Sequence, residues 1–229
     1  PQKTALVFVD AERNEQNFTY NILSVDSALT TNAFKSNLVL AGQRICLYMP
    51  NSPEFIFSYL AVSKIGATSV RLNPALPPDR MKKILKDTDT KLSVERTAGA
   101  LDIKDLRTRR EFLTPDIATI LYSSGTTGEQ KGVKLSASNI YNNIKYTGML
   151  TGMTPEDKII CFLPLTHCFG LNFILGTCLY TGASLVLHEK FDLKQVLESL
   201  VRNKVTMFFA FPAIYNMILK QKIDPFYFS

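Results

Sequence analysis

The sequence has 229 residues, no tryptophan, two histidines and four cysteines. The histidines, His167 and His188, are too few and too far apart for a His-based metal site, and no cysteines form a Cys-x-x-Cys pair. We therefore predict no metal-ligating residues in this chain. Three of the cysteines lie in apolar stretches, which is typical of buried free thiols in a reducing cytoplasm.

Long apolar runs and targeting signals are also absent. The richest apolar segment, MFFAFPAIY, is short and is broken by Pro212, whereas a membrane-spanning helix needs about 20 apolar residues. The first residues show no basic region ahead of an apolar stretch, so no secretory signal is visible. We expect a cytoplasmic protein and leave peripheral membrane contact open.

The composition is that of a globular protein, with 46% hydrophobic and 20% charged residues. It excludes a disordered tail, a collagen-like repeat and a disulfide-stapled miniprotein. The net charge of +6 is compatible with an anionic ligand such as a nucleotide. Because basic and aromatic residues do not interleave, we predict no nucleic-acid groove. The basic residues at 82–86 and 107–110 are interpreted as solvated faces.

Alternating strand and helix patterns predict an α/β fold. Residues 44–73 show the pattern most clearly, as a strand, a helix and a second strand. Asn51 or Ser52 is the expected N-cap of that helix, Pro53 its first residue, and Gly66 its left-handed C-cap. A strand–helix–strand unit with short joints predicts parallel strands. Further strands are expected at 117–124, 158–165 and 205–211, and a polar linker at 96–115.

The strongest chemical signal is a glycine-rich loop, YSSGTTGEQKG, at residues 122–132. Glycines let the backbone bring N–H groups close to an anion, and the hydroxyl side chains add donors. Lys131 adds a charge that can reach a phosphate, and the preceding strand places the loop at a sheet end. The alternative is a polar surface hairpin. A Walker A loop is disfavoured, because Lys131 precedes Gly132 and no Ser or Thr follows the lysine.

The segment YSSGTTGEQKGV resembles the phosphate-binding signature [ST]SGTTGxPKGV of the adenylate-forming superfamily, which includes acyl-CoA synthetases, aryl-CoA ligases, luciferase and peptide-synthetase adenylation domains. Gln130 stands where the family usually has proline. PLTHCFG resembles the family's PxxHxxG motif, and residues 42–94 and 191–219 resemble further family segments. Ala137 replaces the histidine common in the family's [ST]HxN segment. The resemblance covers nearly the whole chain.

The resemblance implies a reaction in two steps. A carboxylate and ATP give an acyl-adenylate and pyrophosphate, and a thiol of coenzyme A or a carrier pantetheine then attacks the adenylate. It implies ATP and Mg²⁺ as cofactors and coenzyme A as co-substrate. Thr126, Lys131 and His167 are the catalytic residues that it implies. The residues expected to hold the ATP phosphates are Ser123, Ser124, Gly125, Thr126, Thr127, Gly128 and Lys131.

The acyl pocket is expected beside His167. The apolar strands 158–165 and 205–211 are each followed by a break marked by proline, and as parallel neighbours they would bring His167 and Phe211 to one sheet edge. From the residues alone, a lone histidine is more often a core residue, and core packing is an equal alternative for Phe211 and Tyr215. His188 is predicted to be an exposed turn residue. The substrate-binding residues that we predict are His167, Phe169, Gly170, Phe211 and Tyr215.

The fold that the resemblance implies is an incomplete N-terminal domain of an acyl-CoA-synthetase-like protein, with layered, mainly parallel sheets. We expect one α/β subdomain at residues 1–106, a second at 107–229 that carries the loop, and no C-terminal lid domain. The family's adenine, ribose and metal motifs lie further downstream, so the chain alone is expected to be inactive. A fatty acid is the expected substrate. The alternatives are an aryl-CoA ligase, a peptide-synthetase adenylation domain, or a non-catalytic nucleotide- or acyl-binding module.

Overall fold

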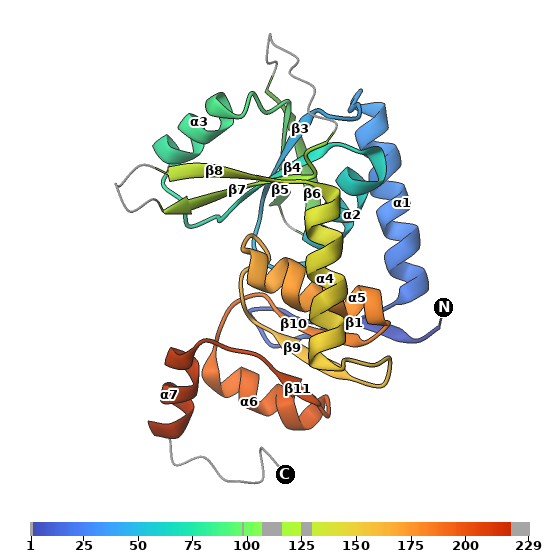
Figure 1. Cartoon of the computed structure of the whole chain (residues 1–229), viewed down its shortest axis with the longest axis vertical. Coiled ribbons are helices and arrows are strands. Elements are labelled where there is room, and N and C mark those ends of the chain that lie inside the picture. Colours follow the sequence, from blue (N-terminus) through green and yellow to red (C-terminus); the bar gives the residue numbers. More distant parts are fainter. Residues whose placement is uncertain (1, 98, 107–115, 125–129, 221–229) are drawn as a thin grey trace. The chain divides into compact units, whose positions relative to one another are not determined.

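A computed structural model describes residues 2–97, 99–106, 116–124 and 130–220 of the chain. It divides into two compact units (Figure 1). The discontinuous unit combines Pro1–Asn21 with Asn143–Ser229, and the continuous unit is Ile22–Asn142. This division differs from the expected boundary at residues 106 and 107. The reason is strand pairing, because the N-terminal strand joins a strand at 184–188 and the strand at 119–124 joins one at 68–72.

The continuous unit is built on a six-stranded sheet. Its central strands are parallel, and the two edge strands are each antiparallel to their neighbour. In order across the sheet the strands are β6 (Ala100–Asp105), β5 (Leu92–Thr97), β3 (Arg44–Tyr48), β4 (Thr68–Leu72), β7 (Thr119–Ser124) and β8 (Gln130–Leu135). Helices α1 (Tyr20–Ser36), α2 (Pro53–Ile65) and α3 (Pro78–Asp87) belong entirely or mostly to this unit, and α4 (Ala137–Thr151) begins in it.

Helix α2 forms as the sequence predicts. Ser52 is the N-cap, and its side chain accepts a hydrogen bond from the Phe55 N–H at 3.1 Å. Pro53 is the first helical residue, where a missing N–H leaves no bond unmade. Gly66 ends the helix with φ of 75°, a left-handed conformation that favours glycine. The strands before and after α2 pair in parallel, which confirms the predicted strand–helix–strand unit.

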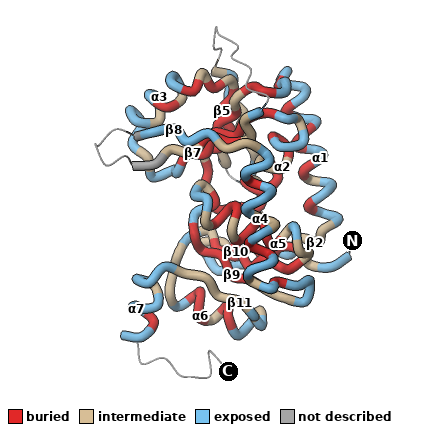
Figure 2. The backbone as a smooth tube through the Cα atoms, viewed as in Figure 1, coloured by how far each residue is buried: buried red, intermediate tan, exposed pale blue. Residues whose placement is uncertain are grey.

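The continuous unit has an apolar core on each face of its central strands, and buried residues follow those strands (Figure 2). On one face, Ile84 of α3 packs against buried residues of β3, β4 and β7, namely Cys46, Val70, Leu72 and Ile120. Helix α2 packs against β3 and β4 through its own buried residues. The expected linker at 96–115 is partly wrong, because residues 100–105 form β6 and pair with β5.

The discontinuous unit is built on a five-stranded sheet with one antiparallel pair, β1 with β2. Its order is β11 (Met207–Phe208), β9 (Lys158–Cys161), β10 (Ser184–His188), β1 (Thr4–Val9) and β2 (Glu15–Thr19). Every residue of β10 is buried, as are Ile159 and Ile160 of β9. The parallel pairing of β9 with β11 confirms that the two apolar strands considered for the acyl pocket are neighbours.

The helices of the discontinuous unit are η1, a π-helix (Phe169–Gly176), α5 (Thr177–Thr181), α6 (Leu193–Arg202), α7 (Pro212–Lys220) and most of α4 (Ala137–Thr151). Helix α4 approaches η1 closely, because a Cβ on Gly176 would lie 2.6 Å from Cδ1 of Ile144. Asp192 caps α6 as expected, accepting from the Gln195 N–H at 2.8 Å. Within the described ranges, no helix is long and apolar enough to cross a membrane.

Candidate active site

The glycine-rich segment connects two adjacent antiparallel strands. Strand β7 ends at Ser124 and β8 begins at Gln130, and Ser123 pairs in register with Lys131. Gly125, Thr126, Thr127 and Gly128 lie outside the described residues, and of Ser123 and Ser124 only the backbone is described. Lys131 is exposed. The segment thus begins at the carboxyl end of β7. This strand lies between β4, to which it is parallel, and the edge strand β8.

The base of β7 is fixed to β4 by side-chain hydrogen bonds. The hydroxyls of Ser69 and Thr119 are 2.9 Å apart, and Thr119 Oγ1 also donates to the Ser69 carbonyl at 3.0 Å. Thr68 Oγ1 donates to the carbonyl of Ile117, just before β7 begins. These bonds satisfy buried polar groups inside the sheet, so they set the position of the strand that leads to the glycine-rich segment.

The segment after β9 holds His167 in a tight turn. The His167 N–H donates to the Pro164 carbonyl at 3.0 Å, and the His167 side chain is exposed. Its Nδ1 atom accepts a hydrogen bond from the Phe169 N–H at 3.3 Å. A neutral imidazole in this arrangement carries its proton on Nε2. Nε2–H is therefore the side of the ring that can donate to a carboxylate or phosphate oxygen.

Gly170 is required by close packing of this turn. A Cβ on Gly170 would lie 2.6 Å from the Pro164 carbonyl oxygen and 3.0 Å from that of Leu163, so any side chain would displace the backbone. The Pro164, His167 and Gly170 pattern thus has a structural basis, because the Pro164 carbonyl accepts from the His167 N–H and Gly170 packs against the same carbonyl. Helix η1 follows directly. The sequence patterns did not predict this π-helix, a form that is frequent at functional sites.

An aromatic cluster follows His167. Phe169 lies 5.3 Å from Phe211 and 4.9 Å from Phe173, and Phe173 lies 5.1 Å from Phe209, all between ring centroids. We call Phe169, Phe173, Phe209 and Phe211 the phenylalanine cluster. It joins residues of η1 to residues that follow β11, and it begins two residues after His167.

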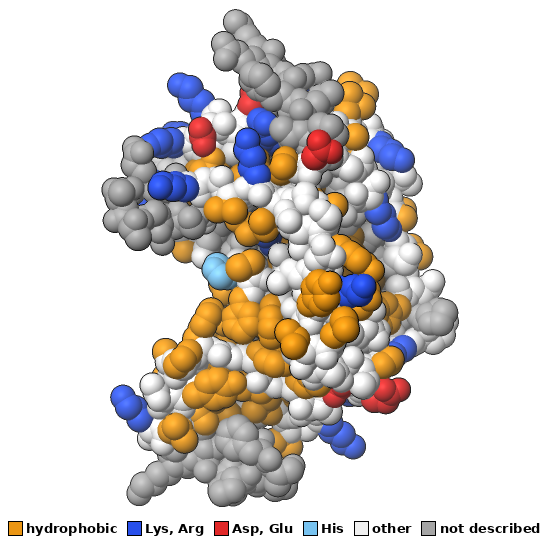
Figure 3. All heavy atoms as spheres, viewed as in Figure 1, with side chains coloured by type: hydrophobic (Ala, Val, Ile, Leu, Met, Phe, Trp, Pro, Cys, Tyr) orange, Lys and Arg blue, Asp and Glu red, His pale blue; other side chains and the backbone are white. Residues whose placement is uncertain are grey.

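Tyr215 does not join this cluster directly. Its ring packs at 5.6 Å on Phe208, and its hydroxyl donates to the Phe208 carbonyl at 3.1 Å. Phe211 and Tyr215 are 46% and 42% exposed, so neither is a buried core residue. Hydrophobic side chains gather over this unit on the face that Figure 3 shows. The phenylalanine cluster thus combines aromatic packing with partial exposure, as a surface for an apolar group requires.

A comparison with known families places the chain. Residues 1–113 and 101–227 match the sequence model described as AMP-binding enzyme, and together these ranges span nearly the whole chain. The chain belongs to the AMP-binding enzyme family.

Two curated relatives show how far the match extends. The chain is 28% identical over 244 residues to 4-coumarate–CoA ligase 2 of Nicotiana tabacum, which covers 90% of this chain and 45% of that protein. It is 27% identical over 239 residues to a 2-succinylbenzoate–CoA ligase of Bacillus velezensis, which covers 96% of this chain and 48% of that protein. The chain therefore spans about half the length of these AMP-binding enzymes.

The fold agrees with solved structures of such enzymes. An O-succinylbenzoate coenzyme A synthetase of Bacillus subtilis, solved in complex with AMP, matches with a TM-score of 0.83 at 23% identity. The match covers 98% of this chain and 62% of that chain. This likeness supports the fold, in which two mostly parallel sheets form the N-terminal part of an acyl-CoA-synthetase-like domain.

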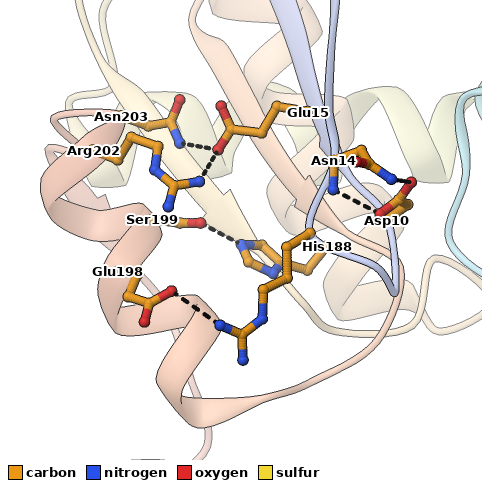
Figure 4. Close-up of polar contacts among 9 residues, drawn as sticks. Asp10, Asn14, Glu15, His188, Glu198, Ser199, Arg202 and Asn203 are labelled. Atoms are coloured by element: carbon orange, nitrogen blue, oxygen red, sulfur yellow. Dashed lines mark hydrogen bonds and ion pairs between the residues drawn. The ribbon is translucent and has the colours of Figure 1, made fainter.

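The predicted exposure of His188 is wrong. The residue was expected in an exposed turn, yet it is the last residue of β10 and is fully buried. Its Nε2 atom lies 3.0 Å from Ser199 Oγ of α6 (Figure 4). Burial lowers the pKa of His188 from 6.5 to about 4, although the carboxylates of Glu15 and Asp192 act in the opposite direction. The imidazole is thus neutral at pH 7 and belongs to the interface of β10 with α6.

The cysteines match the expectation of free thiols. Cys46, Cys161 and Cys178 are buried, and burial raises the pKa of each thiol, to about 12 for Cys46 and Cys161. Cys168 is exposed beside His167, with its Sγ atom 3.7 Å from Nδ1 of the histidine. In the described part of the chain, no group of three His, Cys, Asp or Glu side chains could hold a metal ion.

Proposed function

We propose that the chain supplies the phosphate- and acyl-binding part of an ATP-dependent ligase that joins a carboxylic acid to coenzyme A. The observation that carries the proposal is the signature YSSGTTGEQKGV at the junction of β7 and β8, within a chain that the AMP-binding family matches almost throughout. The chain spans about half the length of its curated relatives, and we assign adenine and ribose binding to none of its described residues.

In this proposal, residues 123–128 and Lys131 bind the phosphates of ATP. The exposed ammonium of Lys131 offsets negative charge as the carboxylate attacks the α-phosphorus, and the backbone N–H groups of the loop hold the departing pyrophosphate. Catalysis would come from positioning and electrostatics rather than from a covalent bond to the protein. Magnesium, when bound, would neutralise phosphate oxygens, and we assign no magnesium ligand to the described residues.

His167 would act on the carboxylate. Its Nε2–H can donate to a carboxylate oxygen because Nδ1 already accepts from the Phe169 N–H. The phenylalanine cluster begins two residues later and offers aromatic rings to an apolar tail. A carboxylate at His167 and its tail along these rings account for the placement of Phe169 and Phe211 in one cluster. Gly170 shapes the turn behind them.

The substrate proposed first is a fatty acid, whose tail needs only apolar contacts. An aromatic acid is the second candidate, favoured by the names of the two curated relatives, which act on 4-coumarate and 2-succinylbenzoate. Thermal unfolding in the presence of a straight-chain fatty acid or 4-coumarate would separate these candidates. Stabilisation by the fatty acid alone is expected, and stabilisation by 4-coumarate alone would replace it with the aromatic acid.

The phosphate role is tested with Lys131→Ala. Removal of one charge-assisted contact should weaken ATP binding by about 1–3 kcal/mol, or roughly 5- to 150-fold, as measured by isothermal titration calorimetry. Lys134→Ala is the matched control. This lysine is exposed on the same strand, but its alternating position directs it to the opposite face. Equal ATP affinities of the wild type and Lys131→Ala would remove Lys131 from phosphate binding.

A further inference from the structure

Tyr122 lies at the base of the glycine-rich segment and faces β8. It pairs in register with Gly132, and the next pair along the two strands is Ser123 with Lys131. Tyr122 is thus the last residue of β7 whose side chain the structure describes before the segment begins. Contacts that hold Tyr122 in place therefore also restrain the backbone of the paired strand, in which Lys131 is next to Gly132.

The ring of Tyr122 is held from two sides. It packs against the apolar cluster formed by Cys46, Val70, Leu72, Ile84 and Ile120. It also covers Gly132, where an added Cβ would lie 3.2 Å from Cζ and 3.3 Å from the hydroxyl oxygen of the tyrosine. A side chain at position 132 would therefore push the ring away. Glycine at this position leaves room for the ring over β8, and Lys131 is the next residue of that strand, with its side chain directed to the opposite face.

The hydroxyl of Tyr122 reaches helix α3. It donates to Oδ2 of Asp87, the last residue of that helix, at 2.5 Å. A carboxylate at a helix C-terminus is disfavoured by the helix dipole, so Asp87 depends on partners such as this hydroxyl. Arg44 adds a positive charge near Tyr122, and its Nη1 atom donates to the Thr88 carbonyl at 2.7 Å. Burial and the Asp87 carboxylate raise the pKa of Tyr122, so the hydroxyl keeps the proton that it donates.

We infer that Tyr122 is a positioning residue for phosphate binding. Its hydroxyl connects the β7–β8 hairpin to α3 by a hydrogen bond to Asp87. Its ring packs on Gly132, so it restrains the backbone of β8 next to Lys131. The role rests on the proposed function, because it is the phosphate contact of Lys131 that would benefit. Tyr122 itself touches no phosphate in this arrangement. Its contribution is to keep the ammonium-bearing strand in one place against the sheet.

The test compares Tyr122→Phe, Asp87→Ala and the double variant in the 229-residue chain, with ATP as the probe in calorimetry. Tyr122→Phe keeps the ring and loses only the hydroxyl, so we expect ATP binding about three- to tenfold weaker. Asp87→Ala removes the acceptor of that hydroxyl and also a charge, so the interpretable quantity is the coupling between the two changes. Once Asp87→Ala is present, Tyr122→Phe should have little further effect on the ATP affinity.

Two controls separate positioning from general stability. Ile56→Val lowers stability at a buried site of α2 and keeps the Tyr122–Asp87 bond, so ATP affinity should not change. Tyr146→Phe removes a hydroxyl from an exposed residue and should change neither the ATP affinity nor the melting temperature. If Tyr122→Phe lowers the melting temperature as Ile56→Val does but binds ATP like the wild type, the positioning role is refuted while the proposed function stands. A wild-type chain that binds no ATP contradicts the proposed function, and the inference falls with it.

Discussion

Acidification should destabilise the discontinuous unit through His188. The folded state holds this imidazole neutral, with a pKa of about 4, whereas the same group in the unfolded chain titrates near 6.5. Between these values the unfolded chain binds a proton that the folded chain does not. The free energy of unfolding therefore decreases as the pH falls from 6.5 toward 4, and the effect is complete below 4.

The size of this effect follows from the pKa difference. Each pKa unit corresponds to about 1.4 kcal/mol, so the shift of His188 predicts a loss of about 3 kcal/mol of stability across this range. No discount for solvent screening applies, because the side chain is fully buried between β10 and α6. The groups near it include the hydroxyl of Ser199 and the carboxylates of Glu15 and Asp192. Glu15 is itself bonded to Arg202 at 3.2 Å and to Asn203 at 3.3 Å (Figure 4).

The assay is urea unfolding followed by far-UV circular dichroism at several pH values from 4 to 7. Other carboxylates also titrate in this range, so the wild type is compared with His188→Gln, which cannot gain a proton. The glutamine amide can still donate to Ser199 Oγ. The stability advantage of the wild type over His188→Gln should shrink by about 3 kcal/mol between pH 7 and pH 4. Hydrogen exchange of the β10 amides would assign the change to this unit.

Two results would refute this reasoning. One is a stability difference between the wild type and His188→Gln that stays constant with pH. The other is a resonance assigned to the His188 imidazole that titrates near pH 6.5 in the folded protein, since a neutral buried ring should not change above pH 5. Either result would mean that water or a carboxylate stabilises the charged form of His188 as well as the unfolded chain does.

Two further predictions concern the turn after β9 and the chain as a whole. Gly170→Ala should lower the free energy of unfolding by about 1–3 kcal/mol, because the new Cβ would lie 2.6 Å from the Pro164 carbonyl oxygen. At Gly148 the nearest atom to an added Cβ is the methyl group of Thr181, at 3.3 Å, so Gly148→Ala should cost less in the same urea titration; equal costs would contradict the packing argument. The 229-residue chain alone should release no pyrophosphate from ATP in the presence of a fatty acid or 4-coumarate, and carboxylate-dependent release in a coupled assay would show that residues 1–229 suffice for adenylation.

Local features of the fold were predictable because their causes lie close together in the sequence. The boundaries of α2 follow from Ser52, Pro53 and Gly66, each of which acts within one helical turn. The parallel pairing of β9 with β11 was expected from the apolar strand character of both segments, each of which is followed by a break marked by proline. The edge strand β6 was missed although Leu101 and Ile103 alternate with polar residues, because six residues at a sheet edge give a weak signal.

Other features depend on contacts that local patterns do not encode. His188 stands before Glu189 and Lys190, which suggested a turn, yet α6 covers it from 11 residues further along the chain. Gly170, near the start of the π-helix, packs closely against the Pro164 carbonyl, a contact that the local pattern does not reveal. The division into units depends on Leu6 of β1 pairing with Leu185 of β10, which are separated by most of the chain. For the glycine-rich segment, the motif itself remains the basis of the phosphate assignment.

The pairing of β1 with β10 also sets the order in which the protein can fold during synthesis. The continuous unit has all its strands once Leu135 has emerged from the ribosome, whereas the first hairpin, β1 with β2, lacks its parallel neighbour until Ser184–His188 follow. At typical synthesis rates of about 5–20 residues per second, the roughly 170 residues between Thr19 and His188 make this delay about 10–30 s. During that time an apolar strand, with Leu6 and Phe8, exposes an edge that can pair with other chains. Chaperone protection of residues 4–19 in the nascent chain is the expected consequence.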